Sequence, residues 1–419
     1  MVPKGWSQKL ISDVGAVVTG NTPSTSNPEY YNGEYPFVSP ADLGVHKFIN
    51  SSIKSLSPQG MEKARSVRAG ATLFTCIGST IGKIGLAGCR LATNQQINAV
   101  IPNPDYDDEY VYYQLELRAA YIAKLAGTQA VPIINKTTFE SQCFLVPDSQ
   151  PEQKKIAKII SAWDKAISTT EQLLANSQQQ KKALMQQLLT GKKRLLDNNG
   201  INFRVSKTPY ATLPSDWGEI AMEEVSSFIT KGATPTTYGF DWQDTGIPFL
   251  RSECVGEDDF KESGLSFICD EAHEAMKRSK VFTGDLLITI TGNVGRVCKL
   301  PDHICEANIN QHIAKITLKP QQVNTDFIYH CLRDIKYRNY FERITTGQAY
   351  PQISLVQVRD VVMPLPSREE QHKIAAVLSI ADQEISALQQ KLNALKQEKK
   401  ALMQQLLTGK RRVKVEAAT

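Results

Sequence analysis

The chain contains one twelve-residue segment twice: KKALMQQLLTGK occupies residues 181–192 and recurs letter for letter at residues 399–410. The offset of 218 residues holds without a gap back to residues 149–153, which match residues 367–371. A match of this length does not arise by chance. Because an internal repeat decides the architecture before any local pattern is considered, the sequence predicts a chain built from two related halves.

Weaker landmarks recur in the same order upstream of each copy. The offset between them drifts by a few residues, as insertions in surface loops produce. The matched pairs are Pro3 and Trp6 with Pro214 and Trp217, residues 20–23 with 232–235 (Gly-x-Thr-Pro), residues 36–37 with 248–249 (Pro-Phe), the glycine loops 78–83 with 292–296, residues 94–97 with 310–313 (Asn-Gln-x-Ile), and residues 129–134 with 348–353.

These landmarks divide the chain into a domain and a helix, each present twice. We place the first domain at residues 1–148, its helix at 149–195, the second domain at 196–366, the second helix at 367–412 and a tail at 413–419.

Within each predicted domain, short β-rich runs alternate with glycine and proline. Residues 72–77 and 285–290 are such runs, and each domain has one helical stretch, at about 109–125 and about 325–343. The predicted fold class is therefore α+β, with two tandem-duplicated globular domains and two long helices related by a pseudo-two-fold axis.

Both long helices have marked ends. Ser149 and Ser367 are expected to be N-caps, each followed three residues later by a glutamate, Glu152 or Glu370, which is the capping-box spacing. The glycines at 191 and 409 stand where a helix would end, beside Lys and Arg that complement the negative end of the helix dipole.

A heptad pattern runs between these ends. A narrow apolar stripe of this kind cannot bury itself, so each helix needs a partner, and the other copy is the simplest one. The seam positions are Ile156, Ile160, Trp163, Ile167, Leu174, Lys181, Leu184 and Leu188 in the first helix and Ile374, Leu378, Ile385, Leu388, Leu392, Leu395, Lys399, Leu402 and Leu406 in the second. The two seam lysines either fix the register of the pair or extend along its edge toward water.

Several classes of function are disfavoured. No stretch is long and apolar enough to predict a membrane span, and the N-terminus does not resemble a secretion signal. The eight cysteines and six histidines show no spacing typical of a disulfide framework or a metal site. No nucleophile is paired with a base, and apparent phosphate-loop, methyltransferase and nuclease motifs each lack an essential residue. We expect a non-catalytic, cytoplasmic binding protein.

The net charge of +5 is unevenly distributed. Residues 152–194 carry +6 and residues 370–412 carry +4, whereas residues 195–369 carry −5. Any nucleic-acid surface on the second domain must therefore be a local basic patch with acidic residues turned away.

The repeated helix resembles the specificity subunits of type I restriction-modification systems. The resemblance rests on Glu-Gln-x-Lys-Ile-Ala, then Ser-x-x-Asp-x-x-Ile, then Leu-Leu-Thr-Gly-Lys, at residues 152–157, 161–167 and 188–192 and again at 370–375, 379–385 and 406–410. The order of variable domain and conserved helix, repeated, covers the whole chain.

This resemblance implies a function and partners. In that family the variable domains are target recognition domains, each reading one half of a bipartite, asymmetric site in double-stranded DNA. The helices form an antiparallel coiled coil that spaces the domains and docks two modification subunits, which use S-adenosylmethionine to methylate adenine at N6. Two restriction subunits add cleavage driven by ATP and magnesium. The resemblance implies no cofactor in this chain.

The repeat also sorts candidate DNA contacts. Residues common to both domains cannot distinguish two half-sites, so they suit phosphate contacts or simply the fold and its turns. These are Thr22, Lys83, Asn94, Gln95, Gln129, Thr234, Arg296, Asn310, Gln311 and Gln348. Base reading should come from segments that differ, 42–68 and 251–280. The candidates there are Lys47, Asn50, Lys54, Arg65, Arg68, Arg251, Ser252, Lys277, Arg278 and Lys280.

A second hypothesis stays open on the residues alone. A coiled-coil scaffold whose duplicated domains bind proteins or glycans would show the same repeat. DNA affinity that falls steeply with salt separates the two hypotheses.

Overall fold

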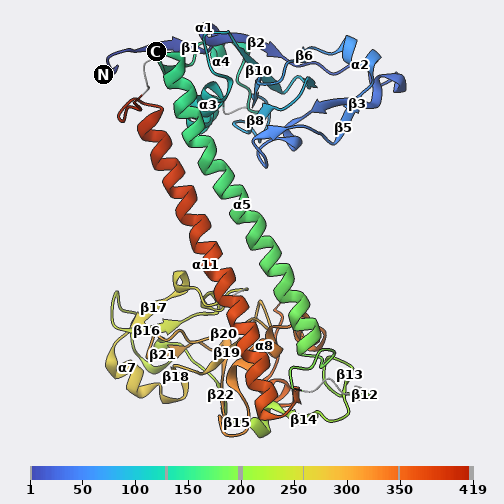
Figure 1. Cartoon of the computed structure of the whole chain (residues 1–419). Helices are drawn as coiled ribbons and strands as arrows, with labels where there is room; N and C mark the ends of the chain where they lie inside the picture. Colours follow the sequence, from blue (N-terminus) through green and yellow to red (C-terminus); the bar gives the residue numbers. More distant parts are fainter. Residues whose placement is uncertain (1, 128–130, 197–201, 258, 348–349, 415–419) are drawn as a thin grey trace. The chain divides into compact units, whose positions relative to one another are not determined.

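The structure is a computed structural model that describes residues 2–127, 131–196, 202–257, 259–347 and 350–414 (Figure 1). The chain divides into two compact units, Met1–Gln172 with Gln390–Thr419, and Leu173–Gln389. Two 39-residue helices, α5 (Gln150–Leu188) and α11 (Arg368–Leu406), each give one half to each unit. The units therefore differ from the predicted domains by including helix halves.

The first unit is built on two sheets and a two-stranded ribbon. A five-stranded sheet has the order β2 (Gly15–Thr19), β10 (Ile97–Pro102), β7 (Thr72–Thr75), β8 (Ile84–Ala87), β4 (Phe48–Ile49). A four-stranded sheet has the order β5 (Lys54–Leu56), β3 (Tyr31–Val38), β9 (Leu91–Thr93), β6 (Ser66–Val67). The ribbon pairs β1 (Trp6–Leu10) with β11 (Cys143–Pro147), and the shorter helices are α1 (Ile11–Val14), α2 (Pro58–Lys63), α3 (Asp108–Ala123) and α4 (Lys136–Glu140).

The second unit repeats this plan. Its sheets have the orders β15 (Ser226–Lys231), β22 (Ile313–Leu318), β19 (Leu286–Thr289), β20 (Val297–Lys299) and β17 (Ser266–Ile268), β16 (Ile247–Leu250), β21 (Glu306–Ile309), β18 (Lys280–Phe282). The ribbons are β14 (Gly218–Ala221) with β23 (Val362–Leu365) and β12 (Phe203–Val205) with β13 (Thr212–Pro214). The helices are α6 (Met222–Val225), α7 (Asp270–Ala275), α8 (Thr325–Arg333), α9 (Ile335–Ile344) and α10 (Leu355–Arg359).

The predicted duplication and α+β class are confirmed at the level of sheet topology. In each unit the second sheet contains one parallel pair, β3 with β9 and β16 with β21, among antiparallel neighbours. One prediction was wrong: the single helix expected at about 325–343 is two helices. Asp334 is extended (φ −62°, ψ 143°) and its side chain accepts a hydrogen bond from Lys336 N, so it ends α8 and caps α9.

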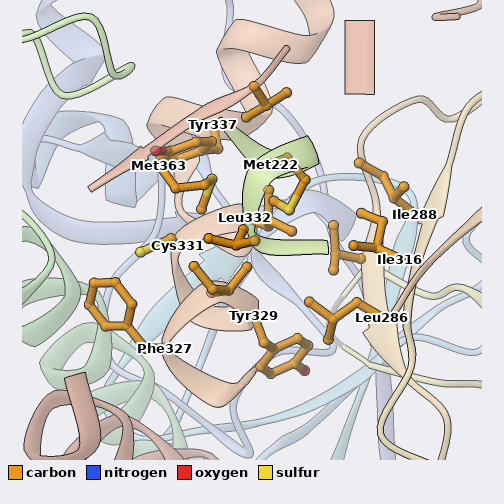
Figure 2. Close-up of a cluster of buried hydrophobic side chains, with 14 of the residues drawn as sticks. Met222, Leu286, Ile288, Ile316, Phe327, Tyr329, Cys331, Leu332, Tyr337 and Met363 are labelled. Atoms are coloured by element: carbon orange, nitrogen blue, oxygen red, sulfur yellow. The ribbon is translucent and has the colours of Figure 1, made fainter. Parts of the chain in front are cut away.

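The core of the second unit lies between its first sheet and α8. Figure 2 shows Leu286, Ile288 and Ile316 of the sheet on one side of the cluster and Phe327 and Leu332 of α8 on the other. All five are at most 1% exposed. Since burying one such side chain contributes about 1.5–3 kcal/mol, this interface holds the sheet and the helix together.

Candidate nucleic-acid interface

The two long helices pack antiparallel within each unit. In the first unit Glu171 pairs with Lys396 (2.7 Å) and Asp164 with Lys399 (2.7 Å), so the numbering falls along one helix as it rises along the other. In the second unit the corresponding pair is Lys181 with Asp382. Every predicted seam residue is buried or half-buried, which is what mutual packing of two heptad stripes requires.

The two seam lysines have equivalent roles. Lys399 binds Glu116 of α3 (3.0 Å) as well as Asp164, and these carboxylates raise its pKa although burial alone would lower it. Lys181 is 9% exposed and binds Asp382, the repeat equivalent of Asp164. Of the two readings of these lysines, the structure favours the one that fixes register, because a one-heptad slip would separate each cation from its aspartate.

The end of each long helix packs on the start of the other at a structure that we call the clasp. In the second unit Arg194 donates two hydrogen bonds to the fully buried Glu370 (2.6 and 2.8 Å), and the Trp217 indole N–H donates to the same carboxylate (3.1 Å). In the first unit Arg412 donates two to Glu152 (2.7 and 2.8 Å). Gly191 and Gly409, at φ 67° and 68°, end the helices as predicted.

The capping-box prediction is right for Ser367 and wrong for the two glutamates. Ser367 does cap α11, since its Oγ accepts a hydrogen bond from Glu370 N (3.2 Å). The glutamate carboxylates do not complete the box: among the described residues their hydrogen-bond partners are the clasp arginines and Trp217. A buried carboxylate gains more from a bidentate guanidinium than from one backbone N–H.

A buried histidine lies beside the ion pair of Lys181 with Asp382 in the second unit, with its Nδ1 3.7 Å from Asp382 Oδ2. His330 is 1% exposed, and its Nε2 lies 3.2 Å from Ser379 Oγ. Burial, aided by the nearby charges of Lys181 and Arg333, lowers the pKa of His330 to about 2. The imidazole is therefore neutral in the folded chain at neutral pH.

The recurring landmarks of the first unit converge into one group of loops, which we call the landmark cluster (residues 20–23, 76–83, 94–97 and 131–134). Thr22 Oγ1 donates to Gln95 Oε1 (2.7 Å), and Gly78 N donates to Pro132 O (2.9 Å). A Cβ on Gly20 would lie 2.3 Å from Asn94 O, so only glycine allows this approach.

The second unit has an equivalent landmark cluster (residues 232–235, 290–296, 310–313 and 350–353). Gly232 N donates to Asn310 O (3.2 Å), and Gly292 N donates to Pro351 O (2.9 Å). A Cβ on Gly232 would lie 1.7 Å from Ile309 O. Segments far apart in the sequence thus form the same surface in both units.

Several common candidates serve the turns of these clusters. Asn94 and Asn310 each accept a hydrogen bond from the backbone N–H two residues later (both 3.1 Å), which forms an Asx-turn. This geometry favours a role for the two asparagines in the turns and not in phosphate contact. Thr22 bonds Gln95, Thr234 bonds Thr237, and Gln311 bonds His312. The two cations among the common candidates are Lys83, which donates a hydrogen bond to Pro40 O (3.3 Å), and Arg296, which is half-buried. The last two candidates, Gln129 and Gln348, lie outside the described residues.

Three candidate base-reading cations are paired with carboxylates of their own domain. Lys47 binds Glu109 and the Tyr113 hydroxyl beneath the domain surface, with a side chain 10% exposed. Arg68 donates two hydrogen bonds to Asp108 (2.7 and 2.8 Å), and Lys280 binds Glu274. These local partners compete with base contact, strongly for the mostly buried Lys47 and only weakly for the more exposed pairs of Arg68 and Lys280.

The other base-reading candidates lie at the surface. Asn50, Lys54 and Lys277 are exposed, and Ser252 is half-buried. The Arg251 guanidinium lies 4.9 Å from the Trp242 ring centroid. Arg65 and Arg278 lie beside the loops that follow β2 and β15 respectively.

Sequence reasoning missed two residues of this surface. Lys231 and Tyr238 line a cavity of about 120 Å³ together with Arg278. Lys231 comes directly before the recurring Gly-x-Thr-Pro segment, and that position was the available signal.

The described residues show neither a membrane-spanning helix nor a cluster of metal ligands. No helix among them is long and apolar enough to cross a membrane, and no group of three or more metal-ligating side chains gathers within this part of the chain. All eight cysteines are free thiols.

The fold and its two landmark clusters define a tandem-duplicated protein with two equivalent surfaces, each on an α+β domain. The family model described as "Type I restriction modification DNA specificity domain" matches residues 3–176 and 214–397. The chain therefore belongs to the family of type I restriction-modification specificity subunits.

Individual relatives agree. The specificity subunit of the type I restriction enzyme MjaVIII from Methanocaldococcus jannaschii is 24% identical over 417 residues, which cover 99% of this chain and 94% of that protein. The HindI specificity subunit from Haemophilus influenzae is 31% identical over 174 residues, 40% of this chain and 38% of that protein. The crystal structure of the S subunit from M. genitalium has a TM-score of 0.65 at 15% identity and covers 97% of this chain and 99% of its own, which shows a shared fold.

Proposed function

We propose that this chain determines the DNA sequence that a type I restriction-modification complex recognises, without catalysing a reaction itself. Each domain reads one half of a bipartite, asymmetric site in double-stranded DNA. The observation that carries the proposal is the landmark cluster, which is common to both units and is bordered by the segments that differ between them. A common surface suits contacts to the DNA backbone, and different borders suit different half-sequences.

The two helices would set the distance between the half-sites. The ion pairs of Asp164 with Lys399 and of Lys181 with Asp382 hold the helices in one register, which a spacer requires. DNA half-sites read from one face lie about one helical turn, roughly 34–36 Å, apart or a multiple of it.

The partners would carry out the chemistry. A related structure with a TM-score of 0.55 and 16% identity, covering 97% of this chain and 98% of its own, is described as the structural basis of complex assembly in a type I system. We infer that two modification subunits dock on the basic helices and that two restriction subunits join through them. S-adenosylmethionine, ATP and magnesium would then act in those partners.

Domain exchange tests the proposal. Residues 1–148 are replaced by the first domain of another specificity subunit, the complex with its modification subunits is purified, and methylated adenines are mapped on genomic DNA. One half-sequence should change while the other and the spacing stay the same. A change in both half-sequences would contradict the proposal. If the unaltered complex shows no sequence-specific DNA binding, the scaffold hypothesis is supported instead.

A further inference from the structure

The cavity of the second domain is formed by three short segments that meet at the landmark cluster. Lys231, Gly232 and Ala233 follow β15, Tyr238 ends the short 3-10 helix Pro235–Tyr238, and Arg278 with Ser279 comes from the segment after α7. Its volume of about 120 Å³ is several times the ~10–15 Å³ that one water requires. A tetrahedral anion therefore fits.

The charge of the cavity is positive and has no internal counterion. Within the described part of the domain, neither Lys231 nor Arg278 forms an ion pair, although neighbouring cations do: Lys280 with Glu274 and Lys299 with Asp326. Both cavity cations are exposed. Residues 195–369 carry a net charge of −5, so a cavity with two unpaired cations is a local exception that attracts an anion.

The backbone around the cavity is held in place. Ser279 is buried, donates to Met276 O (2.9 Å) and accepts from the Asn308 side chain (2.6 Å). Asn308 is itself fully buried and bonded to His273. This buried polar network holds Ser279, the residue next to Arg278. Gly232, the residue next to Lys231, is held by its close approach to Ile309 O and its hydrogen bond to Asn310 O. Both cations are therefore attached to a rigid backbone.

The first domain has an arginine in the corresponding segment, shifted by one position: by strand register Ser66 is equivalent to Lys280, so Arg65 precedes this position by one residue and Arg278 by two. Arg65 follows α2 as Arg278 follows α7. Its NH1 group donates to Thr19 O (3.1 Å) and its backbone N donates to the Asn21 side chain (2.7 Å). Thr19 precedes Gly20 just as Lys231 precedes Gly232. The two arginines therefore border the same loop of the repeat.

We propose that Arg278, with Lys231, binds a backbone phosphate beside the second half-site, and that Arg65 does the same in the first domain. This inference rests on the proposed function and assigns these two arginines to positioning on the DNA and not to base reading. An arginine that borders the same loop in both domains suits a contact that two different half-sites share, and guanidinium is suited to bidentate contact with phosphate.

The test uses the complete complex with its modification subunits and a duplex that carries its mapped site. DNA affinity is measured by fluorescence anisotropy between 50 and 200 mM KCl, a range of roughly fourfold over which phosphate contacts dominate the salt dependence. For Arg278→Ala the slope of log affinity against log salt should fall by about 0.9, the value for one lost phosphate contact, with a further fall when Lys231→Ala is added. The methylated sequence should not change.

Two further variants complete the design. Lys336→Ala removes an exposed lysine of α9 that does not line the cavity, and its slope should equal that of the unaltered complex. Arg278→Lys should retain most of the slope, because it keeps the cation. Unchanged melting temperatures would show that any loss of affinity is not unfolding.

Three results would overturn the inference: an unchanged slope in the double variant, a changed base in the methylated sequence, or binding of inorganic phosphate in the cavity by calorimetry while DNA affinity of Arg278→Ala stays normal. The last result would assign the cavity to a free anion. If the unaltered complex lacks sequence-specific affinity, the proposed function has failed; if it binds and the variants match it, only this inference has failed.

Discussion

The clasp of the second unit allows a quantitative prediction. Arg194→Gln removes the guanidinium that neutralises Glu370, whose side chain is 0% exposed, and leaves that carboxylate with the Trp217 N–H as a partner. Removing one member of a buried ion pair typically costs about 3–5 kcal/mol, because the remaining charge is desolvated. We expect a loss of this size in the stability of the second unit.

The first unit supplies the matched control. Arg412 binds Glu152 with the same two hydrogen bonds, but its side chain is 46% exposed, against 11% for Arg194. Glu152 is itself only 4% exposed, but water already reaches the guanidinium that covers it, so water can replace part of the lost pair and Arg412→Gln should cost clearly less than Arg194→Gln.

Urea denaturation, monitored by hydrogen exchange mass spectrometry, measures the free energy of unfolding of each unit separately. Adding Glu370→Gln to Arg194→Gln should restore part of the lost stability, because the buried charge is then absent. Equal costs for Arg194→Gln and Arg412→Gln, or no recovery in the double variant, would refute the account of the clasp.

Two further outcomes are expected. Deleting residues 168–174 together with 386–392 removes one heptad from each helix between the ion pairs of Lys399 and Lys181, which shortens the pair by about 10 Å at ~1.5 Å per residue. Mapped methylation should show both half-sequences intact and a spacer shorter by up to about three base pairs at ~3.4 Å each. An altered half-sequence would contradict the spacer role. His330, neutral in the fold with a pKa of about 2, binds a proton only in the unfolded chain as pH falls below about 6.5. The stability of the second unit should therefore decrease toward acid by up to about 1.4 kcal/mol per pH unit, and in His330→Gln this contribution should vanish; an identical pH slope in denaturation curves would show that His330 is not the group.

Much of the architecture is readable from the sequence because duplication leaves a signal that needs no structure. The identical segments at 181–192 and 399–410 predict two related halves, and the heptads predict two helices that need each other. Local patterns were less reliable. The break at Asp334 was missed because the apolar spacing continues across it, whereas one capping side chain is enough to end α8.

Long-range partners are what the sequence could not supply. The spacing of Ser367 and Glu370 fits a capping box, but Glu370 is taken by an arginine 176 residues away in the chain. Lys47 and Arg68 had the chemistry of base-reading residues, and only the fold shows that Glu109 and Asp108 hold them. The sequence shows which side chains exist, while the fold decides which of them already have a partner.

The most direct test of the central claim is the map of N6-methylated adenines made by this chain with its modification subunits. The account predicts one recurring motif composed of two unlike half-sequences separated by a spacer of fixed length and arbitrary sequence. A contiguous or palindromic motif, or methylation without a motif, would contradict it.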